Sequence, residues 1–252
     1  MLAASVDFSA LAIVVVGAFI AGFTTGLAGF GTGLVASGLW FHALPATMVP
    51  PMVALGSVVA QFVGMVTVRK AFNWRRVVPF LLGGAIGVAP GVAALSAASP
   101  VLLKLSVGTF LVVYAMYQLS NRLRWNIGEW GGRMADGVVG LGGGFLGGFA
   151  GLSAPLPVMW LQLRGGSRQQ QRALYQPFNM VVLALASVGM AVSGQITADV
   201  LRVSALCLPA TLIGAWIGAR VYVGVSEQTF QRVVLFLLLV SGLILIVEGI
   251  SR

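Results

Sequence analysis

Two glycine-rich stretches of this chain, 122 residues apart, resemble each other in sequence. They cover residues 22–34 and 144–156, and six of their 13 aligned positions are identical. Each stretch places glycine, threonine, serine or proline in the middle of an apolar run of about 30 residues. Since glycine and proline disfavour helix interiors, each stretch predicts a break in a long apolar helix.

The composition places these breaks inside a membrane. Hydrophobic residues make up 58% of the chain and charged residues 8%, and the mean hydropathy is +0.98. Several charge-free windows are longer than the roughly 18 residues that indicate a membrane span. The net charge of +9 would suit nucleic acid, but the basic residues cluster in short loops between apolar segments, where they set membrane orientation. We therefore predict an all-α membrane protein that contacts the lipid bilayer and binds no nucleic acid.

The chain has few residues suited to catalysis or to metal binding. Cys207 is its single cysteine and His42 its single histidine, so we expect no disulfide, metal or cofactor. An intramembrane enzyme is disfavoured because no nucleophile–base or metal set is present. His42 precedes a Leu-Pro turn, and we interpret it as a solvated loop residue.

Eight apolar segments are expected along the chain. They span about 8–41, 46–68, 77–95, 101–119, 134–163, 173–193, 203–222 and 230–250. The first and fifth are too long for one straight crossing of a core of about 30 Å, at about 1.5 Å per residue. These two segments also carry the glycine-rich stretches, so we expect each to form a re-entrant hairpin of two half-helices.

The distribution of basic residues favours one topology. If all eight segments crossed and the N-terminus lay inside, nine basic residues would be cytoplasmic and six external. With two re-entrant hairpins and an external N-terminus, twelve are cytoplasmic and three external. The positive-inside rule favours the second arrangement, which makes both termini external.

That topology divides the chain into two inverted repeats. Each half holds one hairpin and three crossings, an odd number, so the halves, 1–121 and 134–252, face opposite ways around a cytoplasmic linker, 122–133, within one transmembrane domain. Inverted repeats favour an alternating-access carrier. Further matches pair Gly87 and Gly91 with Gly214 and Gly218, for which we favour a helix-packing role.

The paired motifs resemble a known family. Residues 26–31 and 147–155 are similar to the duplicated signature of the sulfite exporter TauE/SafE family, whose members are bacterial inner-membrane carriers. The second copy has Ser153 and Pro155 where the first has Gly31 and Gly33. The resemblance covers about 8–250 and implies a transporter, favoured as an exporter, of small organosulfur anions such as sulfite or sulfoacetate.

The chemistry of a helix break suits such an anion. A half-helix begins with unpaired N–H groups and a partial positive charge, and glycine lets a ligand approach the backbone closely. Three uncharged polar residues within spans would add amide donors or, equally well, bond neighbouring helices. The predicted substrate-binding residues are Gly29, Phe30, Gly31, Thr32, Gly151, Leu152, Ser153, Ala154, Gln61, Gln176 and Asn179.

Three arginines are expected near the cytoplasmic surface. Arg164, Arg168 and Arg172 either line a mouth that concentrates anions or serve only as a topology signal. We expect Asp136 to pair with Arg133, and Tyr175 to lie in the interfacial aromatic belt. The sequence places no charged residue at the centre of a span, which argues against a fixed countercharge there.

Other functions stay open at this point. A channel or carrier for another small oxyanion or carboxylate would need similar donors. A non-transporting scaffold is disfavoured because it gains nothing from unpaired backbone at membrane depth. Glycine-rich outer faces would also permit a homodimer.

Overall fold

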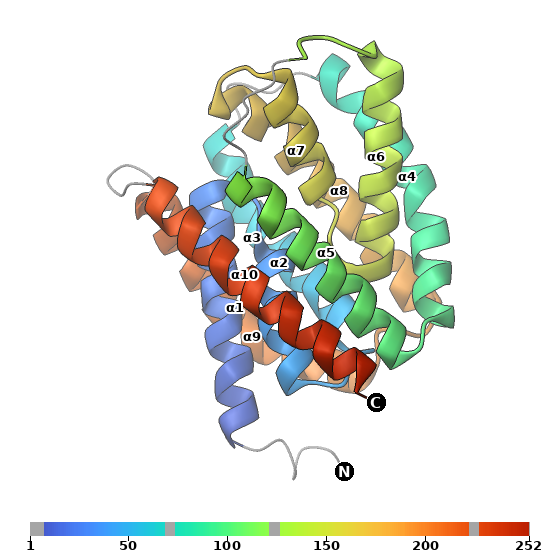
Figure 1. Ribbon diagram of the computed structural model, residues 1–252, viewed down its shortest axis with the longest axis vertical. Coiled ribbons are helices and arrows are strands. Elements are labelled where there is room, and N and C mark those ends of the chain that lie inside the picture. Colours follow the sequence, from blue (N-terminus) through green and yellow to red (C-terminus); the bar gives the residue numbers. More distant parts are fainter. Residues whose placement is uncertain (1–7, 69–73, 121–126, 222–226, 252) are drawn as a thin grey trace.

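The computed structural model describes residues 8–68, 74–120, 127–221 and 227–251. Within these ranges the chain forms ten α-helices and no strand (Figure 1). They are α1 (Phe8–Ala28), α2 (Thr32–Ala43), α3 (Val49–Val68), α4 (Trp74–Ala97), α5 (Pro100–Ser120), α6 (Gly132–Ala150), α7 (Pro155–Arg164), α8 (Arg168–Val192), α9 (Ala198–Val221) and α10 (Glu227–Ile250).

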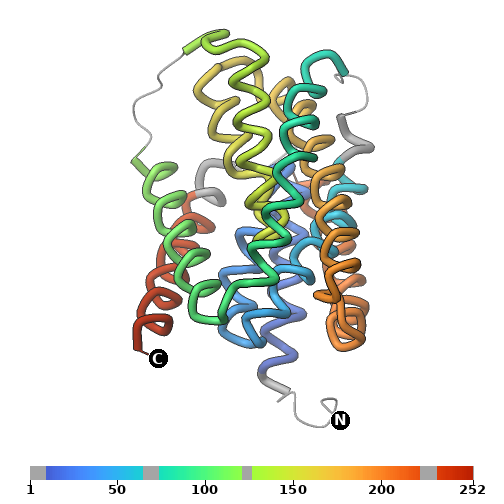
Figure 2. Tube along the Cα trace, turned by 90° about the vertical axis from the view of Figure 1, so that its right-hand side faces the viewer, coloured from blue at the N-terminus to red at the C-terminus, as the bar shows by residue number. Residues whose placement is uncertain are grey.

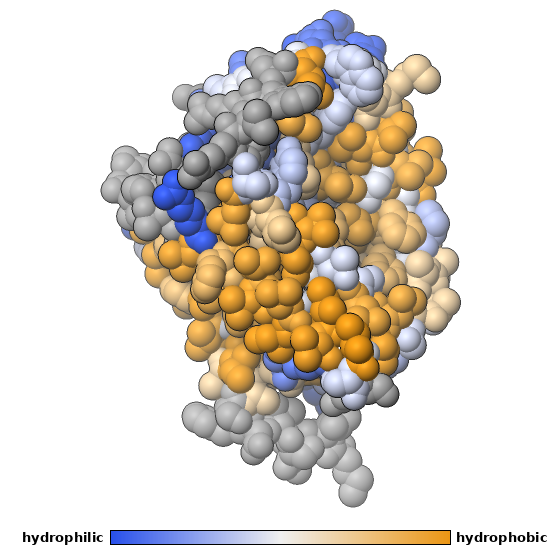
Figure 3. Space-filling model, in the orientation of Figure 1, coloured by the Kyte–Doolittle hydropathy of each residue, from blue (hydrophilic) through white to orange (hydrophobic). Residues whose placement is uncertain are grey.

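The fold is that of a multi-pass membrane protein, as predicted. Six helices are long and apolar enough to cross a bilayer, namely α1, α4, α5, α8, α9 and α10. The face formed by α5 and α10 is covered mainly by apolar side chains, with polar residues toward its two ends (Figure 3). Such a surface is stable against lipid and costly in water.

Both long apolar segments are broken where the glycine-rich stretches predicted. The first divides into α1 and α2, and the second into α6 and α7. The α1–α2 hairpin begins and ends at the lower end of the bundle, and the α6–α7 hairpin begins and ends at the upper end (Figures 1 and 2). The two breaks meet inside the bundle, because a Cβ on Gly33 would lie 2.8 Å from the Gly151 carbonyl oxygen.

Glycine stripes bring two pairs of helices into backbone contact. On the α4–α6 pair, a Cβ on Gly87 would overlap the Leu141 carbonyl, and one on Gly144 would overlap the Gly84 carbonyl. The α1–α9 pair repeats this arrangement at Gly22, Gly26, Gly214 and Gly218. The predicted packing role of Gly87, Gly91, Gly214 and Gly218 is thereby confirmed. The beginning of each glycine-rich stretch thus packs helices, and its end forms the break.

The α4–α6 contact predicts unequal effects of alanine at two glycines. Gly87→Ala must push the helices apart, so we expect a loss of about 1–3 kcal/mol and a melting temperature in detergent that is lower by several degrees. Gly137→Ala is the matched control, because its Cβ would lie 3.7 Å from the nearest atom, the Pro79 carbonyl oxygen. The control should be neutral, or stabilising through helix propensity. Equal melting temperatures for the two variants would contradict the close packing.

Candidate anion site

The first break consists of three residues between α1 and α2. Gly29 and Gly31 have φ angles of 82° and 116°, which residues with a Cβ rarely adopt. The Thr25 hydroxyl closes the break, because it accepts a hydrogen bond from the Thr32 N–H at 2.8 Å and also bonds the Thr32 hydroxyl. The threonine pair therefore holds α2 in place and satisfies one N–H of its first turn.

Two further N–H groups at the start of α2 find no acceptor in the described part of the chain. Among the described residues, the first amide of α2 that donates to a backbone carbonyl is that of Val35, which bonds the Gly31 carbonyl at 3.0 Å. No acceptor is found within the described ranges for the N–H groups of Gly33 and Leu34. They form the partly positive end of a helix deep in the bundle, where an anion is stabilised.

The last carbonyls of α1 are bound by a buried arginine. Arg172, only 6% exposed, donates from Nη2 to the Gly26 carbonyl at 2.9 Å and from Nη1 to the Leu27 carbonyl at 3.5 Å. We expected Arg172 at an open mouth, but it lies at the first break, because carbonyls away from water need donors. Its charge offsets the partly negative end of α1, which would otherwise repel an anion at α2.

Two more side chains complete this cap. The Tyr175 hydroxyl donates to the Ala28 carbonyl at 2.7 Å, and Gln61 Nε2 donates to the Gly29 carbonyl at 3.3 Å. Tyr175 is buried, so our expectation of an interfacial belt position was wrong. The carbonyl end of the first half-helix is thus fully engaged, and its neighbour α2 keeps open donors.

The second break ends its first half-helix in a different way. Gly151 has a φ angle of 74°, and its N–H donates to the Gly147 carbonyl at 2.9 Å. The Leu152 N–H reaches back to the Leu146 carbonyl at 3.1 Å. The backbone thus binds the Leu146 and Gly147 carbonyls around the left-handed cap residue Gly151, and within the described residues no side-chain donor is found at the end of α6.

The second half-helix at this break, α7, offers fewer amide donors than α2. Pro155 occupies its first position and Pro157 its third, and proline has no N–H. Ser153, buried just before α7, donates its hydroxyl to Asn179 Oδ1. The two breaks are therefore chemically unequal, although their sequences are related.

A small cavity lies between the two breaks. About 10 Å³ of it is open to the centre of a water molecule, which is room for roughly one water and not for sulfite. In this conformation the cavity is therefore too small for such an anion. The lining residues are Phe30, Gly31, Gly33, Leu34, Ser57, Gly151, Leu152, Ser153, Ala154, Pro155, Asn179 and Leu183.

The lining includes one polar residue that the sequence analysis missed. The Ser57 hydroxyl is buried and has no hydrogen-bond partner within the described part of the chain. Ser57 lies four residues before Gln61, so the two share one face of α3, and that spacing could have identified it.

Four of the predicted residues lie beside the cavity and do not line it. Gly29 and Thr32 form the first break, and Gln61 caps α1. Both amide atoms of Gln176 are buried against Gly64, without a hydrogen bond to any described residue. The helix–helix hydrogen bond considered for Gln176 is therefore not formed with any described residue, and its role as a substrate ligand stays a prediction.

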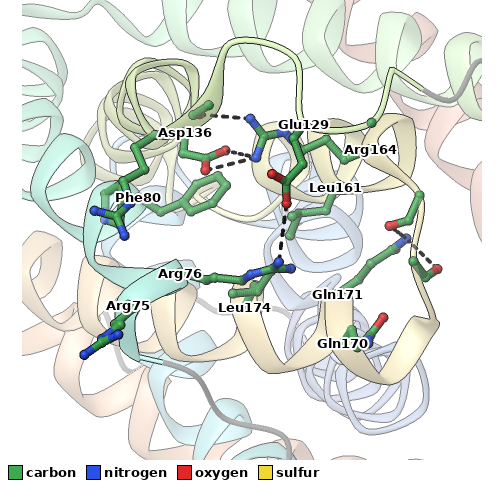
Figure 4. A pocket seen from close by; sticks show the side chains of 16 residues that line it. Arg75, Arg76, Phe80, Glu129, Asp136, Leu161, Arg164, Gln170, Gln171 and Leu174 are labelled. Atoms are coloured by element: carbon green, nitrogen blue, oxygen red, sulfur yellow. Dashed lines mark hydrogen bonds and ion pairs between the residues drawn. The ribbon is translucent and has the colours of Figure 1, made fainter.

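A larger basic cavity opens at the upper end of the bundle, with about 500 Å³ open to water (Figure 4). It is formed where α4, α6 and α8 begin and α7 ends, and we call it the vestibule. Its charged lining residues are Arg75, Arg76, Arg133, Arg164, Glu129 and Asp136. Four arginines against two carboxylates give a positive field that attracts anions.

Within the vestibule, Arg164 is held in place by its neighbours. It lies 3.0 Å from Asp136, which also accepts from Trp160 Nε1 at 2.8 Å (Figure 4). We expected Asp136 to pair with Arg133, but α7 brings Arg164 to it from 28 residues away. Arg168 does not line the vestibule and is exposed at the start of α8.

The opposite end of α2 is hydrogen-bonded to α10. His42 lies in the last turn of α2, with Nδ1 at 3.1 Å from Glu248 and Nε2 at 3.1 Å from Ser241. Glu248 also binds Lys104 of α5 at 2.5 Å. His42 is exposed, as expected of a solvated residue, but it is helical and partnered, so its interpretation as a loop residue was wrong.

These features define a multi-pass α-helical membrane protein built around two broken helices. The model of the family described as Sulfite exporter TauE/SafE matches residues 14–245, and the chain belongs to this family. The family comprises membrane transporters of sulfur anions such as sulfite. No curated protein and no solved structure matches the chain.

The cap on α1 predicts that two arginines of α8 contribute differently to the stability of the folded protein. Arg172→Gln removes charged hydrogen bonds to buried carbonyls, so we expect a loss of roughly 1.5–3 kcal/mol, measured as a lower melting temperature in detergent. Arg168→Gln removes the same charge from an exposed position and should change stability by less than about 0.5 kcal/mol. Equal stability of the two variants would contradict the cap.

Proposed function

We propose that this protein is a secondary transporter that exports small organosulfur anions, such as sulfite or sulfoacetate, by alternating access around the two helix breaks. The observation that carries the proposal is the pair of open N–H groups, those of Gly33 and Leu34, beside the second break. These donors face a cavity that also holds the Ser57 hydroxyl and Asn179.

The electrostatics of the first break support an anionic substrate. An anion that leaves water loses its hydration and needs replacement donors. The start of α2 provides such donors, and a helix end in a partly buried setting stabilises an anion by up to about 2 kcal/mol. Arg172 removes the opposing effect of the α1 carbonyls, so the net field at the break is positive.

The arrangement of the helices supports inverted repeats and alternating access. The α4–α6 and α9–α1 contacts correspond to each other when the halves are exchanged, and both use glycine against backbone. The two hairpins enter from opposite ends (Figures 1 and 2). A closed central cavity and an open vestibule suit a carrier with one gate at each end.

We place the protein in the bacterial inner membrane with the vestibule in the cytoplasm and both termini outside. The arginines gathered around the vestibule support this orientation. Anions would then concentrate at the cytoplasmic entrance before export. The membrane potential supplies roughly 2.3 kcal/mol per 100 mV for a monovalent anion, which drives export without a partner ion.

Removal of the Ser57 hydroxyl tests the binding site. Ser57→Ala should leave the melting temperature of the substrate-free protein unchanged or slightly higher, since the hydroxyl has no partner there. It should weaken sulfite and sulfoacetate binding about tenfold, measured by calorimetry, through the loss of one hydrogen bond to a charged ligand. Ser37→Ala is the matched control, because Ser37 is equally buried and unpaired among the described residues but does not line the cavity.

A flux screen in proteoliposomes decides among substrates. We expect flux of sulfite or sulfoacetate, and weaker flux in Ser57→Ala than in Ser37→Ala. If both variants transport alike, the cavity is not the binding site. Preferred transport of oxalate would indicate a carboxylate carrier, and preferred transport of zwitterionic taurine would contradict the anion site.

The orientation can be tested by cysteine labelling in spheroplasts. The chain's single cysteine, Cys207, is buried, so the unaltered protein is a suitable blank. Ser251→Cys, near the C-terminus, should react with a membrane-impermeant maleimide. Gln169→Cys, exposed at the start of α8, should react only after lysis. The opposite pattern would reverse the proposed direction of the vestibule.

A further inference from the structure

A second cavity adjoins the first break on the side away from the vestibule. About 100 Å³ of it is open to the centre of a water molecule, against about 10 Å³ between the breaks. It is formed by the end of α1, the start of α2, α5, α10 and one residue of α7. Its lining residues are Thr24, Ala28, Phe30, Gly31, Leu34, Val35, Tyr114, Gln118, Gln162, Val234, Leu235 and Leu238.

This cavity and the break cavity share one wall. Phe30, Gly31 and Leu34 line both of them, so the start of α2 lies between the two spaces. The helix α2 runs from the break toward the lower end of the bundle, and its first amides therefore point back toward the break (Figure 1). An anion at these amides is in reach of either cavity.

The second cavity contains a buried hydroxyl donor. Tyr114, 3% exposed, accepts a hydrogen bond from Gln118 Nε2 at 3.1 Å. Among the described residues, no acceptor is found for the hydrogen of its own hydroxyl. Tyr114 can therefore donate to an anionic group that sits between α5 and the start of α2.

Among the described residues, the rest of the lining is mainly aliphatic and carries no charged residue. Val35, Val234, Leu235 and Leu238 form a wall on α2 and α10. A second ionic group against this wall would lose its hydration without a partner, whereas a hydrocarbon chain would gain by burial.

We propose that this cavity is a tail pocket, which binds the short uncharged hydrocarbon chain of an organosulfonate whose sulfonate sits at the amides of α2. The inference rests on the proposed function and adds that, among organosulfur anions, those with an uncharged aliphatic chain bind more tightly than sulfite or sulfoacetate. The cavity is large enough for roughly three waters, at ~30 Å³ each, and so for a few carbons of such a chain.

The test measures the affinity of the purified full-length protein for sulfite and for unbranched alkanesulfonates, from methane- to hexanesulfonate. Affinity should rise about fourfold with each methylene until the pocket is full, and then level off or fall. A sulfocarboxylate of equal length should bind more weakly than the alkanesulfonate, because its second charge meets the aliphatic wall. Neutral methyl sulfones of equal length should not bind measurably.

Substitutions on α10 test whether the dependence of affinity on chain length arises in this cavity. Val234→Trp fills the pocket and should abolish the dependence on chain length while sulfite still binds. Val233→Trp is the control, because Val233 is 54% exposed on the outer face of the same helix and should behave as the wild type. Val234→Phe is a milder change that should move the optimum to a shorter chain, and melting temperatures show that each variant is folded.

The outcomes separate the two proposals. Two outcomes overturn the tail pocket and leave the proposed function intact. In the first, sulfite binds and all alkanesulfonates bind with equal affinity whatever their chain length. In the second, affinity depends on chain length but neither Val234 variant changes that dependence. Neutral sulfones that bind as well as the sulfonates also overturn it, because the head group would then not be held. Failure of every sulfur anion to bind overturns the proposed function and the tail pocket together.

Discussion

The satisfaction of broken backbone inside a membrane is the constraint on which this structure depends. Each break exposes carbonyls at the end of one half-helix and N–H groups at the start of the next, where lipid offers no hydrogen bonds. At the first break Arg172, Tyr175 and Gln61 bind the carbonyls, and two N–H groups of α2 stay open. The open donors and the neutralised carbonyl end together are the basis of the anion site proposed at this break.

The two breaks differ in how their backbone groups are bonded. At the second break α6 ends in backbone hydrogen bonds around the left-handed Gly151, and the prolines of α7 remove two amide donors. Ser153 and Asn179 bond each other there and form one side of the central cavity. The first break therefore offers more helix amide donors than the second, and residues of both breaks line the central cavity. The glycine stripes on α4–α6 and α1–α9 hold these hairpins at fixed depth.

The features that were predictable from the sequence are those that arise from local backbone geometry. The positions of both breaks followed from Gly29, Gly31 and Gly151, which take φ angles that other residues avoid. The apolar segments and the packing glycines followed from composition and spacing. Side-chain partners were less predictable: Asp136 was assigned to the nearby Arg133, but it binds Arg164 on another helix.

By itself, therefore, the sequence determined a membrane-embedded bundle, two interrupted helices and membership of an anion-transporter family, because hydropathy, glycine conformation and motif spacing are local properties of the chain. Only the tertiary structure decided which side chains bind the carbonyl end at the first break. Arg172 reaches the Gly26 carbonyl across 146 residues, and Ser57 joins the cavity because α3 packs beside both breaks. Such contacts depend on how helices that are distant in sequence cross one another, and no local pattern records that crossing.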